Sequence, residues 1–358
     1  MTGEESLTNQ LKLGIDFLKS GHLEKAENTF NEILADIEEE PNALNYLGLI
    51  FQRRGNLRQA YELIQKSLKS DDSNYFAYSN LGKILLQAGK PREAVICFEE
   101  SIIRKGDCSD SWLFLSTTLY ALGDNERAFE SIRKAIELNP GYYGAYIKLG
   151  NMLKDQGAIE EAIGSYRRAI EISPDCADAY SNLGIVLKDL GKFEEAIKNF
   201  RIVIELNPAY AGGYSNLGNA LRGQGKFEEA IKNYKKAIEL NPTYIGAYSN
   251  LGNALKGQGK FEEAMHNYRK AIELDPGFAG VYNNLGEILK TQGILNEAIE
   301  NFQMAIDLDP NFDSAYCNLG NALQQTGAFS EAIDAYQKAM NIKPWSLTAS
   351  WGISSCLD

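Results

Sequence analysis

Residues 211–244 read AGGYSNLGNALRGQGKFEEAIKNYKKAIELNPTY, and residues 245–278 read IGAYSNLGNALKGQGKFEEAMHNYRKAIELDPGF. The two segments are identical at 25 of 34 positions, which indicates a tandem duplication. A fixed period of this length is typical of proteins in which each repeat packs on its neighbours. Extending the period through the chain predicts ten units: 7–40, 41–74, 75–108, 109–142, 143–176, 177–210, 211–244, 245–278, 279–312 and 313–346.

Each unit has the pattern of two helices. Positions are counted from the first residue of each unit, and apolar or small residues stand at the fourth, seventh, eighth and eleventh: Tyr214, Leu217, Gly218 and Leu221. This spacing is helical and differs from the alternation of a strand. We expect the first helix to end near Gly225, because glycine commonly adopts the left-handed conformation that closes a helix. The second helix then begins near Phe227 and ends before Pro242.

Small residues recur at two positions inside these helices. Position twenty is alanine in all ten units, and position eight is glycine in nine, with Ser116 as the exception. Glycine inside a helix costs about 1 kcal/mol relative to alanine. We therefore predict that the second helix packs so closely against position eight that a larger side chain would not fit.

The pattern Tyr-x-x-Leu-Gly-x-x-Leu, followed by Ala-x-x-x-Tyr, Ala and Pro, resembles the tetratricopeptide repeat. The resemblance covers residues 7–346 and implies an all-α fold: an α-solenoid, a right-handed superhelix of ten antiparallel helix pairs. It also implies that the first helices line a concave groove that holds peptides. The proline that ends the later units is replaced by Glu38, Asp72 and Gly106 in the first three. We expect the superhelix geometry to change near residue 106.

Composition narrows the classes of partner. The chain has 358 residues, a formal charge of −12 and a pI near 4.9, and this acidity argues against nucleic acid and anionic membranes as partners. Five scattered cysteines form no C-x-x-C pair, which is typical of a reducing, cytoplasmic compartment. No signal peptide and no membrane-spanning apolar run is apparent in the sequence.

The expected groove carries a pattern of amides and cations that packing does not require. Position six holds asparagine in six units, whereas other units have Tyr46, Phe114 or lysine there. An amide offers donors and an acceptor to the backbone of an extended peptide. The row resembles the asparagine ladder of the O-linked N-acetylglucosamine transferases, where it binds the substrate backbone. The candidate peptide-binding residues are Asn80, Asn182, Asn216, Asn250, Asn284 and Asn318 at position six; Asn151, Asn219, Asn253 and Asn321 at position nine; and Lys154, Lys188, Arg222, Lys256 and Lys290 at position twelve.

Two other interpretations of the amides stay open. The asparagines can bond to neighbouring helices, or they can have spread by duplication alone. A carboxylate clamp like that of chaperone-binding tetratricopeptide proteins would need basic residues that the chain lacks, since position five holds Ile147, Ser215 and Ser249.

Catalysis finds little support in the sequence. The only histidines, His22 and His266, are far apart, and the Gly-Gln-Gly segments at 223–225 and 257–259 lack the third glycine of a dinucleotide loop. We therefore expect no catalytic residues, no metal and no cofactor. The preferred hypothesis is a scaffold that binds protein or peptide partners. The alternatives are the substrate-targeting part of a glycosyltransferase whose catalytic domain is on another chain or missing here, and a purely structural assembly element.

Residues 347–358, LTASWGISSCLD, are long enough for one helix. We expect either a capping helix for the last repeat or the start of a truncated unit. Exposed apolar surface at the solenoid ends predicts weak self-association.

Overall fold

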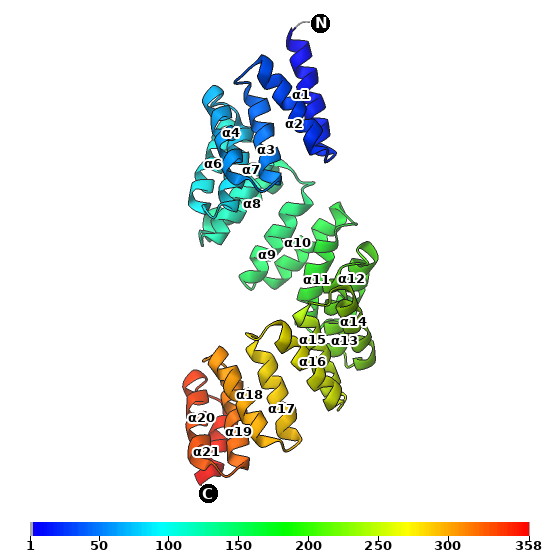
Figure 1. The fold of residues 1–358 in the computed structure, drawn as a ribbon, viewed down its shortest axis with the longest axis vertical. Helices are drawn as coiled ribbons and strands as arrows, with labels where there is room; N and C mark the ends of the chain where they lie inside the picture. The colour runs from blue at the N-terminus through cyan, green and yellow to red at the C-terminus, as the bar shows by residue number, and fades with distance from the viewer. Residues whose placement is uncertain (1–2, 358) are drawn as a thin grey trace. The chain divides into compact units, whose positions relative to one another are not determined.

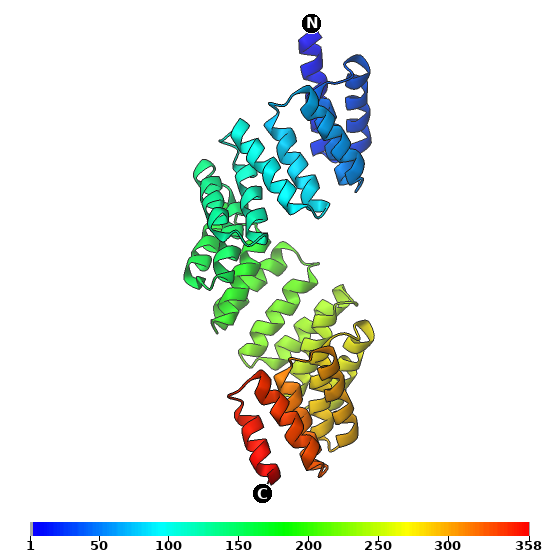
Figure 2. The same ribbon diagram turned by 90° about the vertical axis from the view of Figure 1, so that its left-hand side faces the viewer.

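The computed structural model describes residues 3–357, which fold as helices joined by short turns, with no strand among them. The helices divide into two compact units, the first ending at Cys176 and the second beginning at Ala177. Figures 1 and 2 show two views of the ribbon, coloured along the chain. The predicted all-α solenoid of helix pairs is confirmed.

The first unit holds ten helices in five antiparallel pairs, in which each odd-numbered helix packs on the even-numbered helix that follows it. Their bounds are α1 Gly3–Lys19, α2 Leu23–Asp36, α3 Pro41–Arg53, α4 Leu57–Ser70, α5 Tyr75–Gln87, α6 Pro91–Arg104, α7 Ser109–Ala121, α8 Asn125–Leu138, α9 Tyr143–Asp155 and α10 Ile159–Ile172.

The second unit repeats this arrangement five times and adds one helix. Its helices are α11 Ala177–Asp189, α12 Phe193–Leu206, α13 Ala211–Gly223, α14 Phe227–Leu240, α15 Ile245–Gly257, α16 Phe261–Leu274, α17 Ala279–Thr291, α18 Leu295–Leu308, α19 Asp313–Gln325, α20 Phe329–Ile342 and α21 Leu347–Leu357. Each pair packs on the next, so the repeat continues without interruption inside this unit.

The junction near residue 106 is not a boundary between compact units. Helix α6 packs directly on α7 across it, and the Trp112 indole donates a hydrogen bond of 2.8 Å to the Gly106 carbonyl. The division falls instead after Cys176. A change of superhelix geometry near residue 106 stays a prediction.

The predicted reason for the small residues is confirmed. A Cβ atom built on Gly218 would lie 2.6 Å from Cε1 of Tyr234, which is too close for any side chain. The alanine at position twenty is fully buried in every unit. The tight turn after the first helix also forms as expected, with Gly225 at a φ of 79°. Where position eight is glycine, the second helix thus packs too closely for a larger side chain.

The last helix, α21, packs on α20 and on α19. The ring of Tyr336 lies between two glycines, since a Cβ on Gly320 would approach it to 2.6 Å and a Cβ on Gly352 to 2.3 Å. The other face of α21 is open, with Trp351 75% and Leu357 73% exposed.

Candidate functional site

The asparagines at position nine are tied to tyrosines of the second helix in the same repeat. Each accepts a hydrogen bond of 2.7–2.8 Å from a tyrosine hydroxyl fifteen residues later. The pairs are Asn151 with Tyr166, Asn219 with Tyr234, Asn253 with Tyr268, and Asn321 with Tyr336. The amide oxygen is therefore occupied within the fold, and the NH2 group is turned away from the tyrosine.

The tyrosines are well suited to this donor role. Their side chains are fully buried, and burial raises the pKa of Tyr166, Tyr234 and Tyr336 to about 12. Burial also raises the pKa of Tyr268. Each hydroxyl stays protonated at neutral pH and fixes the orientation of the amide that it contacts.

The sequence contains a signal for these pairs, although helical spacing alone does not reveal it. Position nine is asparagine only in the four repeats in which position twenty-four is tyrosine. Where position twenty-four is phenylalanine, position nine is Ile15, Lys83, Ile185 or Glu287. The two positions therefore vary together within this chain, as expected of residues in contact.

The asparagines at position six divide into two groups. Three of them bond to residues of a neighbouring first helix. Asn80 is 1% exposed and donates to Asn45 across 3.1 Å, Asn284 donates to Asn253, and Asn318 donates to Asn283. A buried amide such as Asn80 cannot contact a ligand, and we leave it out of the candidate surface. These three asparagines therefore bond to neighbouring helices, which is one of the two open interpretations.

The second group consists of Asn182 on α11, Asn216 on α13 and Asn250 on α15. Each is partly exposed, and its side chain makes no hydrogen bond to any residue between 3 and 357. The NH2 groups of Asn219 and Asn253 belong to the same helices and likewise donate to no described residue. We call these five residues the amide surface of the second unit.

A polar network of Glu287, Lys256 and Asn318 lies next to the amide surface. Glu287 on α17 accepts hydrogen bonds from Asn318 at 3.1 Å and pairs with Lys256 at 2.6 Å. Burial would raise the pKa of Glu287, but Lys256 and Asn318 outweigh it and hold that pKa below its usual value. This carboxylate therefore joins three first helices and is not free to bind a cation.

Three of the five cations at position twelve form ion pairs within the chain. Lys154 lies 3.7 Å from Asp155, Lys188 lies 2.7 Å from Asp189, and Lys256 pairs with Glu287. Arg222 is exposed, and its charge opposes the rise in the pKa of Tyr234. The charge of Lys290 lowers the pKa of Glu287, as that of Lys256 does. An electrostatic pull on an acidic ligand is thus weaker than the sequence suggests.

The remaining features of the described residues add no reactive centre. No group of three or more His, Cys, Asp or Glu side chains within residues 3–357 is arranged to hold a metal ion. Over the same span, no helix combines the length and apolar character that crossing a bilayer requires.

Comparison with protein families places most of the chain in one group. Models described as TPR repeat or tetratricopeptide repeat match residues 79–143, 150–210 and 218–346. A model described as anaphase-promoting complex, cyclosome, subunit 3 matches residues 19–101. The comparison with curated proteins finds no match.

Solved structures show the same fold. Yeast Tom70 is 16% identical, with a TM-score of 0.54 over 99% of this chain and 95% of its own. PilF from Pseudomonas aeruginosa is 21% identical, with a TM-score of 0.52 over 60% of this chain and 97% of its own. At these identities the likeness concerns the fold alone.

Proposed function

Because the chain belongs to the tetratricopeptide-repeat family, we propose that it is a binding scaffold that holds an extended peptide on the amide surface of its second unit. Proteins built from this repeat generally mediate protein or peptide interactions. The observation that supports this particular surface is the set of three free amides, Asn182, Asn216 and Asn250, at the same position of consecutive first helices.

The chemistry of the surface favours the peptide backbone over any particular side chain. Each free amide can donate to a backbone carbonyl and accept from a backbone N–H. Asn219 and Asn253 can only donate, because their oxygens are held by Tyr234 and Tyr268. An extended peptide exposes both groups along its length, whereas a helical peptide has used them internally.

The test compares free amides with one that the fold already uses. Peptides selected from a displayed random library on the wild-type chain would be titrated against the triple variant N182A/N216A/N250A. We expect affinity to fall by about 0.5–1.5 kcal/mol per lost hydrogen bond, while the melting temperature stays level or rises. The control is N80A, which should lower stability and leave the affinity of the folded protein unchanged.

Proline substitution in the selected peptide supplies the second test. Removing backbone N–H groups should weaken binding more than exchanging side chains does. The proposal fails if the triple variant binds the selected peptides as tightly as the wild type. It also fails if proline has no effect anywhere along the peptide.

A further inference from the structure

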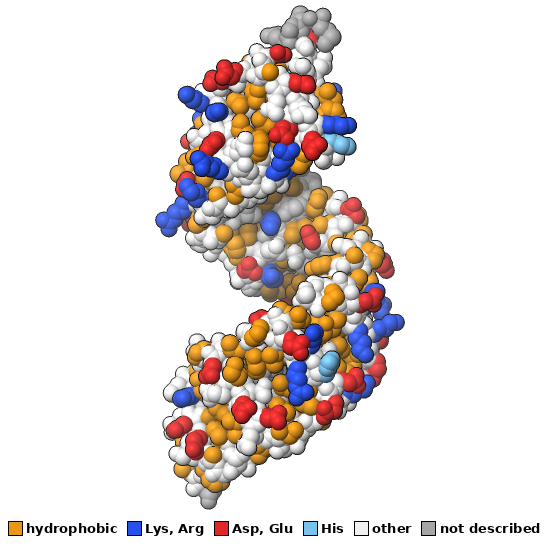
Figure 3. Space-filling view, viewed as in Figure 1, with side chains coloured by type: hydrophobic (Ala, Val, Ile, Leu, Met, Phe, Trp, Pro, Cys, Tyr) orange, Lys and Arg blue, Asp and Glu red, His pale blue; other side chains and the backbone are white. Residues whose placement is uncertain are grey.

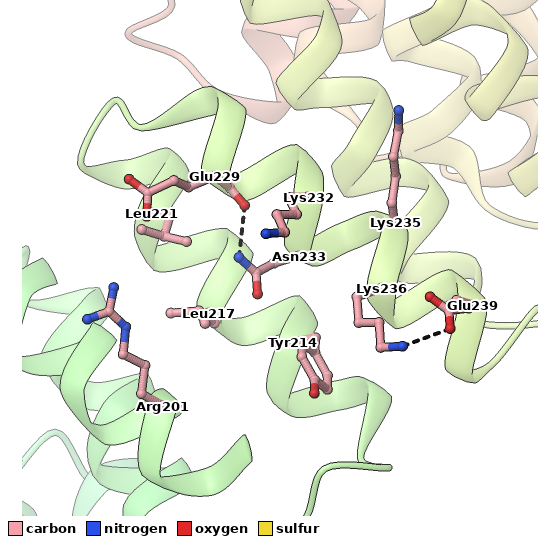
Figure 4. Close-up of a pocket in the computed structure, with 10 residues that line it drawn as sticks. All are labelled: Arg201, Tyr214, Leu217, Leu221, Glu229, Lys232, Asn233, Lys235, Lys236 and Glu239. Atoms are coloured by element: carbon pink, nitrogen blue, oxygen red, sulfur yellow. Dashed lines mark hydrogen bonds and ion pairs between the residues drawn. The ribbon is translucent and has the colours of Figure 1, made fainter. Parts of the chain in front are cut away.

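A series of grooves lies on the opposite side of the helix pairs, between consecutive second helices. The groove between α12 and α14 has a volume of about 590 Å³, and Tyr214, Leu217 and Leu221 of α13 form its apolar floor. Figure 4 shows Arg201 reaching the groove from α12 and Lys232 from α14. None of the sequence patterns described above indicates a site at this place.

The charges around this groove are unbalanced. Six charged side chains line it: Arg201, Lys232, Lys235, Lys236, Glu229 and Glu239. Lys236 pairs with Glu239 at 2.7 Å. The other three cations form no ion pair with any residue between 3 and 357, and only Glu229 remains to offset them. The groove therefore carries a surplus of positive charge in a chain with a formal charge of −12, which would attract an acidic ligand.

The neighbouring groove between α14 and α16 has the same shape and a different charge. Its volume is about 520 Å³, and Tyr248 and Leu251 form the equivalent floor. The charged groups around it are Lys235, Glu262 and Glu263, together with His266. This groove therefore has two carboxylates and one lysine, and lacks the surplus of cations. The apolar floor is thus a property of the repeat, whereas the cations belong to one groove.

A groove in the first unit leads to the same conclusion. Between α6 and α8, Trp112 and Leu115 form the floor of a groove of about 560 Å³. Its two cations are paired, Arg127 with Glu99 and Lys134 with Glu137 at 3.0 Å. No surplus of positive charge remains in that groove, and the additional carboxylate of Glu130 makes it slightly acidic.

Further basic side chains of the second unit lie around the groove, interspersed with carboxylates. Figure 3 shows lysine and arginine side chains gathered over the region that Figure 1 labels α12 to α16. Carboxylates flank these side chains at both ends of each second helix, as Glu228 and Glu239 do on α14. These carboxylates disfavour a long polyanion and leave room for a short acidic segment.

We propose that the groove between α12 and α14 binds an acidic peptide segment of a partner protein through one apolar side chain and flanking carboxylates. A leucine-sized side chain packs on the floor of Leu217 and Leu221. Carboxylates on either side of it pair with Arg201 and Lys232. Apolar burial supplies affinity, and the unpaired cations select an acidic sequence.

The experiment uses a short labelled peptide built of glutamates around one leucine, titrated by fluorescence anisotropy against the full chain. The test variant is Arg201→Glu, and its matched control is Arg269→Glu, an exposed arginine at the same repeat position on α16. Both variants change the net charge equally. We expect Arg201→Glu to weaken binding about threefold to tenfold, and Arg269→Glu less than about twofold.

Further measurements sharpen the result. The double variant R201E/K232E should weaken binding further, and raising the salt concentration should weaken binding to the wild type. A probe with glutamine in place of glutamate, or serine in place of leucine, should bind poorly. The amide-surface variant N182A/N216A/N250A should bind the probe normally, which separates this proposal from the proposed function.

Several outcomes would overturn the proposal. Equal effects of Arg201→Glu and Arg269→Glu would show that binding depends only on the net charge of the protein and not on this groove. Tight binding of the glutamine probe would remove the role of the cations. Displacement of the peptide by a labelled single-stranded oligonucleotide that binds more tightly would assign the surface to nucleic acid.

Thermal melts of both variants should match the wild type, because both arginines are exposed.

Discussion

The first helices of the two units fill the same position in different ways. In the first unit, position six carries Tyr46 stacked on Phe30 and Phe114 stacked on Phe98, with ring centroids 5.5 and 5.7 Å apart. In the second unit, every first helix of a complete pair has asparagine there. The helix pairs close equally well around rings and around amides. Position six can therefore differ between units, and Asn182, Asn216 and Asn250, which make no hydrogen bond within residues 3–357, need an explanation other than folding.

The largest expected effect on stability comes from substituting the glycine at position eight. The side chain that faces this glycine differs between Gly48 in the first unit and Gly252 in the second. A Cβ on Gly252 would lie 2.4 Å from the Tyr268 ring, whereas a Cβ on Gly48 would lie 2.6 Å from Cγ1 of Ile64. The rigid ring cannot turn aside, and it also holds Asn253. We expect Gly252→Ala to cost about 1–3 kcal/mol of unfolding free energy, and Gly48→Ala to cost less. Chemical denaturation of both variants measures the difference, and equal losses would contradict the argument.

The second prediction compares a buried amide of the first unit with a free amide of the second. Asn80→Ala leaves the side-chain amide oxygen of Asn45 without its partner in a buried site, which costs about 1–3 kcal/mol. Asn216→Ala removes no hydrogen bond within the described chain and places a better helix former there. Its melting temperature should equal or exceed that of the wild type. A drop as large as that of Asn80→Ala would show that Asn216 is structural.

The third prediction concerns lysines that face different surroundings in the two units. Lys83 has no ion pair among residues 3–357 and lies 4.6 Å from the centroid of the Phe114 ring, and burial lowers its pKa. Lys256 pairs with Glu287. Lys83→Met should change stability by less than about 1 kcal/mol. The cation–π contact is lost, but the cost of removing the charged amine from water is lost with it. Lys256→Met should destabilise by about 1 kcal/mol, since it removes the direct ion-pair partner of Glu287.

Acid provides the check on Lys256 and Glu287. The pKa of Glu287 is lowered in the folded chain, so its contribution to stability is present above the unfolded pKa of roughly 4.3 and is lost as pH falls through the folded value. The difference in stability between wild type and Lys256→Met should therefore shrink below about pH 4. A difference that does not depend on pH would mean that the pair is not what stabilises the network.

The sequence predicts the close packing well and the polar contacts poorly, for a physical reason. Glycine at position eight and at Gly225 is specified by backbone geometry, and a fixed period is enough to reveal it. Where a long side chain ends depends on rotamers, which spacing does not encode. The lysines at position twelve therefore looked like a basic line, although Lys188 and Lys256 are paired with carboxylates. The Asn219 and Tyr234 contact could have been predicted, because the two residue types vary together along the chain.

The smallest expected effect tests that contact directly. Tyr234→Phe removes the hydroxyl that donates to Asn219 across 2.8 Å and should cost about 0.5–1.5 kcal/mol. The chain itself supplies the alternative, since Phe200 at the same position accompanies Ile185. The double variant Y234F/N219I should therefore recover stability relative to Tyr234→Phe alone. If the two single effects simply add, the residues are not coupled and their joint variation reflects duplication.

Alkaline titration distinguishes the hydroxyl from the ring. Burial raises the pKa of Tyr234 to about 12 in the folded chain, above the unfolded value of about 10. Between these values the unfolded chain loses the proton and the folded chain keeps it, so stability is full below about pH 10 and falls as pH rises toward 12. Tyr234→Phe lacks this group, and its stability should decline less steeply over that range. Because Tyr166, Tyr268 and Tyr336 still titrate in the variant, the slope of stability against pH should fall by only a fraction. An unchanged slope would show that burial does not hold the Tyr234 hydroxyl in its neutral form.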